Sequence, residues 1–194
     1  MGRNGHPILS IPLFCPEFLA RRFLAANRDW IATHRTPPPK RFSDGQRLTI
    51  LGQEVQICHA PNQAGTVLRD DRLLVGGEDS FLNRRVTDYI KRRTQEYIAA
   101  RAPALAQKIG RTVRRITLKD TTSRWGSCST QGNLNFCWRL GMAPLFVLDY
   151  IIAHEVAHLS EMNHSPRFWQ VVSNLCDRRA DAEIWLRRHG ADLR

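Results

Sequence analysis

The stretch APLFVLDYIIAHEVAHLSEMNHS, from Ala143 to Ser165, holds the pattern that decides both the fold and the chemistry of this chain. At its centre, His154, Glu155 and His158 form an HExxH pattern. Residues four apart lie on the same face of a helix, so the two imidazoles can bind one ion, and Glu155 can take a proton from a metal-bound water. His164 follows six residues after His158 as a candidate third ligand. Three protein ligands leave one coordination position open for water, so the stretch predicts a hydrolytic metal site.

The residues before the pattern argue against a chance match. HExxH also occurs in helices whose histidines are merely exposed or hydrogen-bonded. Here residues 145–152, LFVLDYII, are apolar on nearly every side, which predicts a buried helix. Two imidazoles and a carboxylate at the end of a buried helix are costly unless an ion or a partner satisfies them.

Composition places the chain among ordinary globular proteins. It has 194 residues, 42% of them hydrophobic and 24% charged, enough for one substantial domain or for a compact domain with a smaller one attached. No apolar run is long enough to span a bilayer, and residues 1–14 lack the features of a signal peptide. The five cysteines are scattered without a CxxC pair, which favours a reducing compartment. We therefore expect a cytoplasmic protein without a membrane partner.

The chain is strongly basic, with a net charge of +11. Residues 81–118 hold ten Lys or Arg and two acidic residues. A nucleic acid is one partner that such a segment would suit, but the solvated face of a long helix explains the charge better. No helix-turn-helix, zinc finger or RNP motif is present to support nucleic-acid binding.

Residues 1–77 are expected to form a small β-rich N-terminal region. The spacing of apolar residues predicts a helix over residues 16–34, and the prolines at 37–39 predict a stiff linker after it. Two hairpins are expected next, over residues 47–59 and 66–75.

Residues 78–194 are expected to form the metallohydrolase domain. A helix begins at Ser80, and Pro103 is expected to kink or divide it. Two strands, 113–119 and 133–140, are expected to flank a polar loop, and Pro144 opens the HExxH helix.

The chain must turn after His158 if His164 is to reach the same ion. Asn163 tolerates the left-handed conformation that ends helices, so it is the expected pivot. Ser165 and Pro166 are a suitable N-cap and first-turn pair for the next helix. A last helix is expected over residues 180–189, ending at Gly190.

The histidine spacing equals that of the metzincin signature HExxHxxGxxH, but two features exclude that class. Glu161 stands where the signature has glycine, and no methionine follows Met162 to form a Met-turn. A downstream acid is the alternative third ligand. We favour His164 because it is tethered close to the other two histidines. The acids that remain alternatives are Glu183, Asp177 and Asp181.

The run SRWGSCSTQGNLNFCWRLGMAPLFVLDYIIAHEVAHLSEMNHSPRFW, residues 123–169, resembles the YgjP-like metallopeptidase family, which is similar to the SprT-like and WLM zincins. The similarity extends weakly upstream through residues 44–53. It implies an α+β fold with a minimal zincin-like core, in which the HExxH helix packs on a small sheet. By motif position the resemblance implies that zinc (Zn2+) binds His154, His158 and His164, with Glu155 as the general base. Cys137 departs from the asparagine or serine expected there.

Candidate substrate-binding residues lie on the loop before the second predicted strand and near the end of that strand. Gly126 would allow a close approach, and the loop around it can run beside a cleft and pair with an extended peptide. Arg124, Trp125 and Arg139 are further candidates, and Tyr150 joins both arginines and Trp125 as a candidate oxyanion donor. Structural ion pairs and core packing are the competing roles for these side chains.

These features favour a zinc metallopeptidase that acts on a peptide or protein. Two alternatives use the same metal: a nucleotide or phosphate-ester hydrolase, suggested by the basic surplus, and a nucleic-acid-associated protease positioned by residues 81–118. In a fourth, non-enzymatic interpretation the metal only stabilises the fold. The open coordination position and the adjacent Glu155 disfavour this interpretation.

Overall fold

The computed structural model describes residues 9–33 and 41–193, which divide into one unit ending at Arg41 and a second unit, Phe42–Arg194. The first unit holds α1 (Glu17–Ala26) and α2 (Arg28–Thr33) in place of the single helix predicted for residues 16–34. Asn27 separates them, because its backbone N–H and its side-chain amide both donate to the carbonyl of Phe23 and end α1. The predicted proline linker at residues 37–39 lies outside the described residues.

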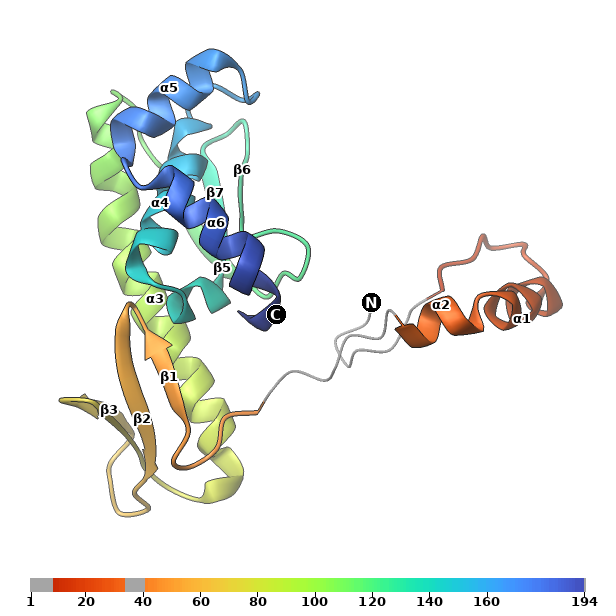
Figure 1. Cartoon of the computed structure of the whole chain (residues 1–194), viewed down its shortest axis with the longest axis horizontal. Helices are drawn as coiled ribbons and strands as arrows, with labels where there is room; N and C mark the ends of the chain where they lie inside the picture. Colours follow the sequence, from red (N-terminus) through yellow and green to blue (C-terminus); the bar gives the residue numbers. More distant parts are fainter. Residues whose placement is uncertain (1–8, 34–40, 194) are drawn as a thin grey trace. The chain divides into compact units, whose positions relative to one another are not determined.

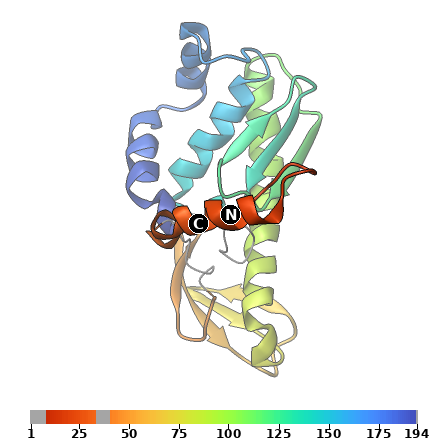
Figure 2. The same cartoon turned by 90° about the vertical axis from the view of Figure 1, so that its right-hand side faces the viewer.

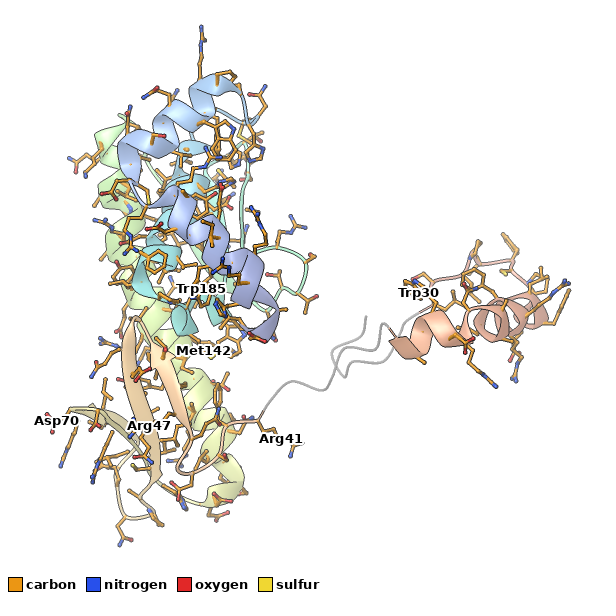
Figure 3. The ribbon with its side chains drawn as sticks, viewed as in Figure 1. Trp30, Arg41, Arg47, Asp70, Met142 and Trp185 are labelled. Atoms are coloured by element: carbon orange, nitrogen blue, oxygen red, sulfur yellow. The ribbon has the colours of Figure 1, made fainter. Side chains whose placement is uncertain are left out.

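The second unit begins with a four-stranded sheet in the order β1-β2-β4-β3 (Figure 1). Both predicted hairpins are confirmed: β1 pairs with β2, and β3 pairs with β4, each antiparallel. Asp70, at the tip of the second hairpin, takes a positive φ of 52°, which Asp tolerates in tight turns (Figure 3). The two hairpins join through a parallel pairing of β2 with β4. The strands are β1 (Arg47–Ile50), β2 (Gln53–His59), β3 (Thr66–Arg69) and β4 (Arg72–Val75).

One long helix, α3 (Leu82–Lys108), follows a short 3-10 turn, η1 (Asp79–Phe81), and packs along both sheets of the unit (Figures 1 and 2). Pro103 lies inside α3 and does not divide it, although the ring removes one helical N–H. The buried residues of α3 continue on both sides of Pro103, from Ile98 to Ala102 and Leu105. Burial of this stripe therefore holds the helix together across the proline.

The second sheet has the order β5-β7-β6, in which β5 (Arg115–Lys119) runs parallel to β7 (Asn133–Cys137). The edge strand, β6 (Gly126–Cys128), pairs antiparallel with β7 and occupies a segment predicted to be a polar loop. Its residues, Gly-Ser-Cys, carry no alternating apolar pattern, so pairing with β7 sets their conformation. β7 ends earlier than predicted, because the chain turns into the 3-10 helix η2 (Trp138–Met142).

The C-terminal part packs around the predicted HExxH helix, α4 (Leu145–Ala157), which contacts α3, α5 and α6. Ser165 caps α5, and its hydroxyl accepts from the N–H of Phe168 as predicted. The left-handed pivot predicted at Asn163 is wrong: in the described chain only Leu51 and Asp70 are non-glycine residues with positive φ. The remaining elements are α5 (Pro166–Leu175), α6 (Arg179–His189) and η3 (Gly190–Leu193).

The described residues thus form an α+β fold with six α-helices and two small mixed sheets. The larger hydrophobic core surrounds α4, and a smaller one joins the first sheet to the first half of α3 and Trp138. Contacts group both cores into the unit Phe42–Arg194, and the domain boundary expected after residue 77 stays a prediction. Within the described residues, no helix is long and apolar enough to cross a bilayer.

Gly141 in η2 joins the two cores. Its carbonyl accepts a 2.8 Å hydrogen bond from the N–H of Leu51, in the β1–β2 turn, and Met142 beside it packs against the smaller core (Figure 3). A Cβ at Gly141 would collide with the Oγ1 of Thr94, a fully buried residue of α3. Glycine is therefore required for η2 to lie this close to α3.

Gly141→Ala is expected to destabilise the protein by about 1–3 kcal/mol, because overpacking forces α3 and η2 apart. Denaturant unfolding measures the change. Thr94→Ala provides the matched rescue: its hydroxyl bonds only the carbonyl of Ile90, four residues earlier in α3, among the described residues. The double variant should recover most of the loss, and an unrescued loss would contradict the collision.

Candidate metal centre

The end of α4 and the turn that follows bring three histidines together. His154 lies in the last turn of α4 and His158 is its C-cap, with ring centroids 5.1 Å apart. The helix then ends in a tighter turn, in which the N–H groups of Leu159 and Ser160 donate to the carbonyls of Val156 and Ala157, three residues earlier. The following residues return His164 to the same place, just before α5 begins.

The nitrogen atoms of these histidines are close enough to hold one ion. One nitrogen from each of His154, His158 and His164 lies within 4.8 Å of the others, and the Nε2 atoms of His154 and His164 are 3.1 Å apart. A tetrahedral ion with metal–nitrogen bonds of about 2.0–2.1 Å separates its ligands by about 3.3 Å. The spacing of this pair therefore fits two ligands of one ion without rearrangement.

The protonation of the histidines also suits metal binding. Burial, together with the neighbouring imidazoles of His158 and His164, lowers the pKa of His154 to about 4. Burial likewise lowers the pKa of His158. The Nδ1 of His158 lies 3.0 Å from the carbonyl of Glu161, so this nitrogen carries the proton and Nε2 keeps its lone pair. Neutral imidazoles with free lone pairs are the form that binds a metal.

One atom in the cluster lacks a partner. His154 Nδ1 is the only buried side-chain nitrogen or oxygen without a hydrogen bond within the ranges that the structure describes. Buried polar atoms without partners are rare and mark places where an ion or an ordered water belongs. The donor set fits a metal site through the Nε2 atoms of His154 and His164, and the orphaned Nδ1 of His154, on the other side of its ring, is a place for an ordered water.

Two aromatic residues at the start of α5 enclose the histidines. The ring of Phe168 lies 4.5 Å from that of His158 and 5.0 Å from that of His154, and Trp169 stacks on His164 at 5.6 Å. Phe168 is fully buried. These rings restrict the rotation of the imidazoles and lower the local polarity, so the cap at Ser165 that starts α5 also shapes the site.

Glu155 is buried beside the cluster, with only 5% of its surface exposed. Burial raises its pKa to about 8, and the positive charge of Arg124 offsets part of the shift. The carboxylate lies against the backbone of β6: a Cβ at Gly126 would be 2.5 Å from Oε1 and 2.6 Å from Cγ of Glu155. The edge strand and the carboxylate are therefore in direct contact.

A cavity of about 370 Å³ opens beside these groups. It is lined by His154 and Glu155 and by Tyr150, whose hydroxyl donates a 2.9 Å hydrogen bond to Glu183. Glu183 also accepts from Arg179 at 2.8 Å. The alternative downstream ligand Glu183 is thus held by two donors, and the group of metal-ligating atoms in the described chain consists of the three histidines.

The predicted substrate-binding residues separate into two sets. Trp125 and Gly126 line this cavity, and both residues also line a second cavity, together with Arg124. Arg139 lines neither, because its guanidinium is paired with Asp120 at 2.6 Å. A role of Arg139 in substrate binding stays a prediction.

The basic segment 81–118 shows the arrangement of a charged helix surface. Arg92 and Arg93 of α3 pair with Glu96, and Arg101 pairs with Asp149 of α4 at 3.1 Å. These interactions give no support to a nucleic-acid partner.

Sequence reasoning missed the residues that line the second cavity, above all Lys119, Ser127 and Asn135. Lys119 and Asn135 each lie in a predicted strand, where every second side chain points to the same face of the sheet. This alternation could have assigned both residues to one face. The missing information was the pairing of residues 126–128, which brings Ser127 onto the same face.

An α+β domain that gathers three imidazoles beside a buried carboxyl group, next to a cavity, is typical of metal-dependent hydrolases. The chain belongs to the YgjP-like family: the family model described as "YgjP-like, metallopeptidase domain" matches residues 2–189. The predicted resemblance is therefore confirmed over nearly the whole chain. Neither the curated proteins nor the solved structures include a match to it.

His164→Ala is expected to weaken zinc binding at least about a hundredfold, because it removes one of three ligands. Competition with a chromophoric chelator measures the affinity. His189→Ala is the matched control, since this exposed histidine of α6 lies outside the cluster. Equal zinc affinity of the two variants would show that His164 is not a ligand.

Gly126→Ala is expected to lower the rate of hydrolysis about a hundredfold or more while zinc stays bound, because the new methyl group displaces the carboxyl of Glu155. Zinc content and kcat, measured on the same preparation, separate the two effects. Thr130→Ala, at an exposed position just beyond β6 that lines neither cavity, serves as the control. Full activity of Gly126→Ala would contradict a fixed position of Glu155.

Proposed function

We propose that this protein is a zinc-dependent metallopeptidase that hydrolyses peptide bonds with Glu155 as the general base. The observation that carries the proposal is the cluster of His154, His158 and His164 next to a cavity that His154 and the buried carboxyl of Glu155 line. Membership of a metallopeptidase family supports the same reaction.

Zinc is the ion that this ligand set favours. Three imidazole ligands with an open position are a donor set of catalytic zinc, whereas calcium and magnesium select oxygen ligands. Bound there, zinc supplies a Lewis acid that lowers the pKa of a coordinated water toward about 7. The histidines hold the ion, and the rings of Phe168 and Trp169 keep them in place.

Glu155 moves the proton. Burial raises the pKa of its carboxyl, and a zinc ion bound beside it would favour the charged form, which accepts a proton. We assign it removal of a proton from the attacking water and delivery of that proton to the leaving amine. The backbone of Gly126 holds the carboxyl from one side, which keeps its oxygens at a constant place in the cavity.

The free edge of β6 is the proposed binding surface for the peptide. Trp125 and Ser129 direct backbone groups toward β7, with hydrogen bonds of 2.8 and 3.0 Å to Cys137 and Asn133. Bonded residues alternate along an antiparallel strand, so Gly126 and Cys128 direct their N–H and C=O groups away from β7. An extended peptide can pair with these groups beside Glu155.

Glu155→Gln is expected to reduce peptide hydrolysis by about a thousandfold or more, because glutamine keeps the shape but cannot accept the proton. Zinc affinity should stay within about threefold of the native protein, since Glu155 is not one of the ligands. The measurement uses a quenched fluorescent peptide mixture, after removal of metal with a chelator and reloading with zinc.

The same preparations should be assayed with nucleotides and with p-nitrophenyl phosphate. Peptide hydrolysis that survives Glu155→Gln would exclude this residue as the base. Zinc-dependent hydrolysis of the phosphate esters, without hydrolysis of peptides, would replace the proposed peptidase by a phosphoesterase.

A further inference from the structure

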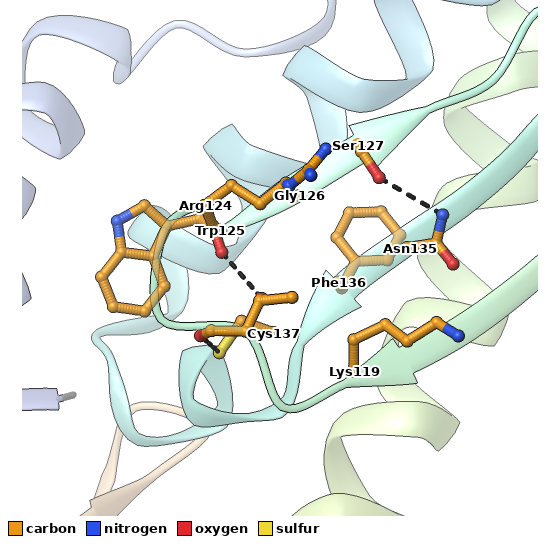
Figure 4. A pocket seen from close by; sticks show the side chains of 9 residues that line it. Lys119, Arg124, Trp125, Gly126, Ser127, Asn135, Phe136 and Cys137 are labelled. Atoms are coloured by element: carbon orange, nitrogen blue, oxygen red, sulfur yellow. Dashed lines mark hydrogen bonds between the residues drawn. The ribbon is translucent and has the colours of Figure 1, made fainter. Parts of the chain in front are cut away.

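The second cavity, of about 350 Å³, lies on the face of the second sheet that points away from the core (Figure 4). Side chains alternate along strands, and Leu134 and Phe136 of β7 are buried in the larger core. Asn135 between them therefore faces outward. In the register of the sheet it lies opposite Thr117 of β5 and Ser127 of β6, so polar side chains of three strands share this face.

The cavity is positively charged. Lys119 reaches it from β5, and Arg124 runs along β6 toward Ser127 (Figure 4). None of the described residues that line it is acidic, and neither cation forms an ion pair within 4.0 Å in the part of the chain that the structure describes. Arg139, by contrast, is neutralised by Asp120. Arg124 is also close enough to Glu155 to lower the pKa of that carboxyl, but no acidic side chain lines the cavity itself, so its two cations attract an anion.

Neutral hydrogen-bonding groups complete the cavity. The side-chain amide of Asn135 donates to the Ser127 hydroxyl at 3.2 Å, which leaves the hydroxyl proton free to donate. Together with the ammonium of Lys119 and the guanidinium of Arg124, this hydroxyl matches the acceptor oxygens of a carboxylate.

The charged cavity adjoins the metal centre through β6. Trp125 and Gly126 line both cavities, so one strand separates them. A peptide paired with the edge of β6 projects successive side chains to opposite faces of the sheet. Side chains on one face then point toward the core side, and those on the other face lie beside Lys119 and Arg124.

We propose that this cavity is a specificity subsite that binds a carboxylate of the peptide substrate, near the bond that is cleaved. The inference rests on the proposed peptidase function and adds the substrate class: peptides that carry a glutamate or aspartate side chain, or a free C-terminus, close to the scissile bond. Lys119 and Arg124 supply the charge, and Ser127 and Asn135 orient the carboxylate.

The test compares pools of capped decapeptides that carry either Glu or Gln at one fixed position and mixed residues elsewhere. At one position at least, the zinc-loaded protein should cleave the Glu pool about tenfold more efficiently in kcat/KM, the size expected for a partly exposed charge-assisted contact. Zinc-loaded Glu155→Gln should bind the Glu pool more tightly by a similar factor, measured by fluorescence anisotropy.

Lys119→Glu should abolish this preference and favour a Lys pool at the same position. Lys119→Gln, which removes the positive charge without adding a negative one, should lose the preference for the Glu pool without gaining one for the Lys pool. Arg115→Glu is the matched control: Arg115 lies on the same strand and the same face, is exposed, and does not line the cavity. It should keep the preference, and zinc content should be unchanged in all three variants.

A further comparison of peptide pools shows whether the bound carboxylate is that of a side chain or that of a free C-terminus. Pools with a free C-terminus and no acidic residue report on the terminal carboxylate, and the capped Glu pools report on the side chain. Equal kcat/KM and equal affinity for the Glu and Gln pools, together with no gain from a free C-terminus, would overturn the proposal. So would a preference that persists in Lys119→Glu.

The two proposals fail in different ways. A Glu preference in binding without any cleavage would leave the subsite standing and would remove the peptidase function. Cleavage without any charge preference would leave the peptidase function standing and would remove the subsite. The absence of both binding and cleavage would overturn both.

Discussion

Three imidazoles, two of them from one helix end, can meet at one point only if the chain turns back within a few residues of that end. In this protein the turn after Ala157 does so, and it depends on rigid elements on both sides. Before it, α4 is buried on nearly all sides, which fixes His154 and His158. After it, the Ser165 cap starts α5 and sets Phe168 against the histidine rings. Core packing and helix capping thus determine the metal geometry.

Local sequence patterns predicted the parts of the fold that local chemistry controls. The hairpins, the cap at Ser165 and the family resemblance were all confirmed. The grouping of His154, His158 and His164 was predicted by helical spacing and one tethered turn, and the structure brings their nitrogens together. The pivot at Asn163 was wrong because backbone hydrogen bonds to Ala157 end the helix earlier, without a left-handed residue.

What could not be predicted depends on contacts between distant segments. β6 has no strand pattern of its own, and its conformation follows from pairing with β7. The charged cavity needs that pairing, because Lys119, Arg124 and Asn135 come from separate segments. Pro103 was expected to interrupt α3, but burial on both sides of it holds the helix continuous. In each case tertiary packing overrides a local preference.

Because Gly126 contacts Glu155, the proposed general base and the proposed substrate-binding strand are expected to move together. A shift of β6 to accommodate a different backbone would carry the carboxyl with it. Substrate selectivity should therefore change more readily through side chains that project from the sheet than through the backbone of β6. Divergence among related enzymes of this architecture should accumulate on the outer face of the sheet, while the Gly126 position tolerates no added atom.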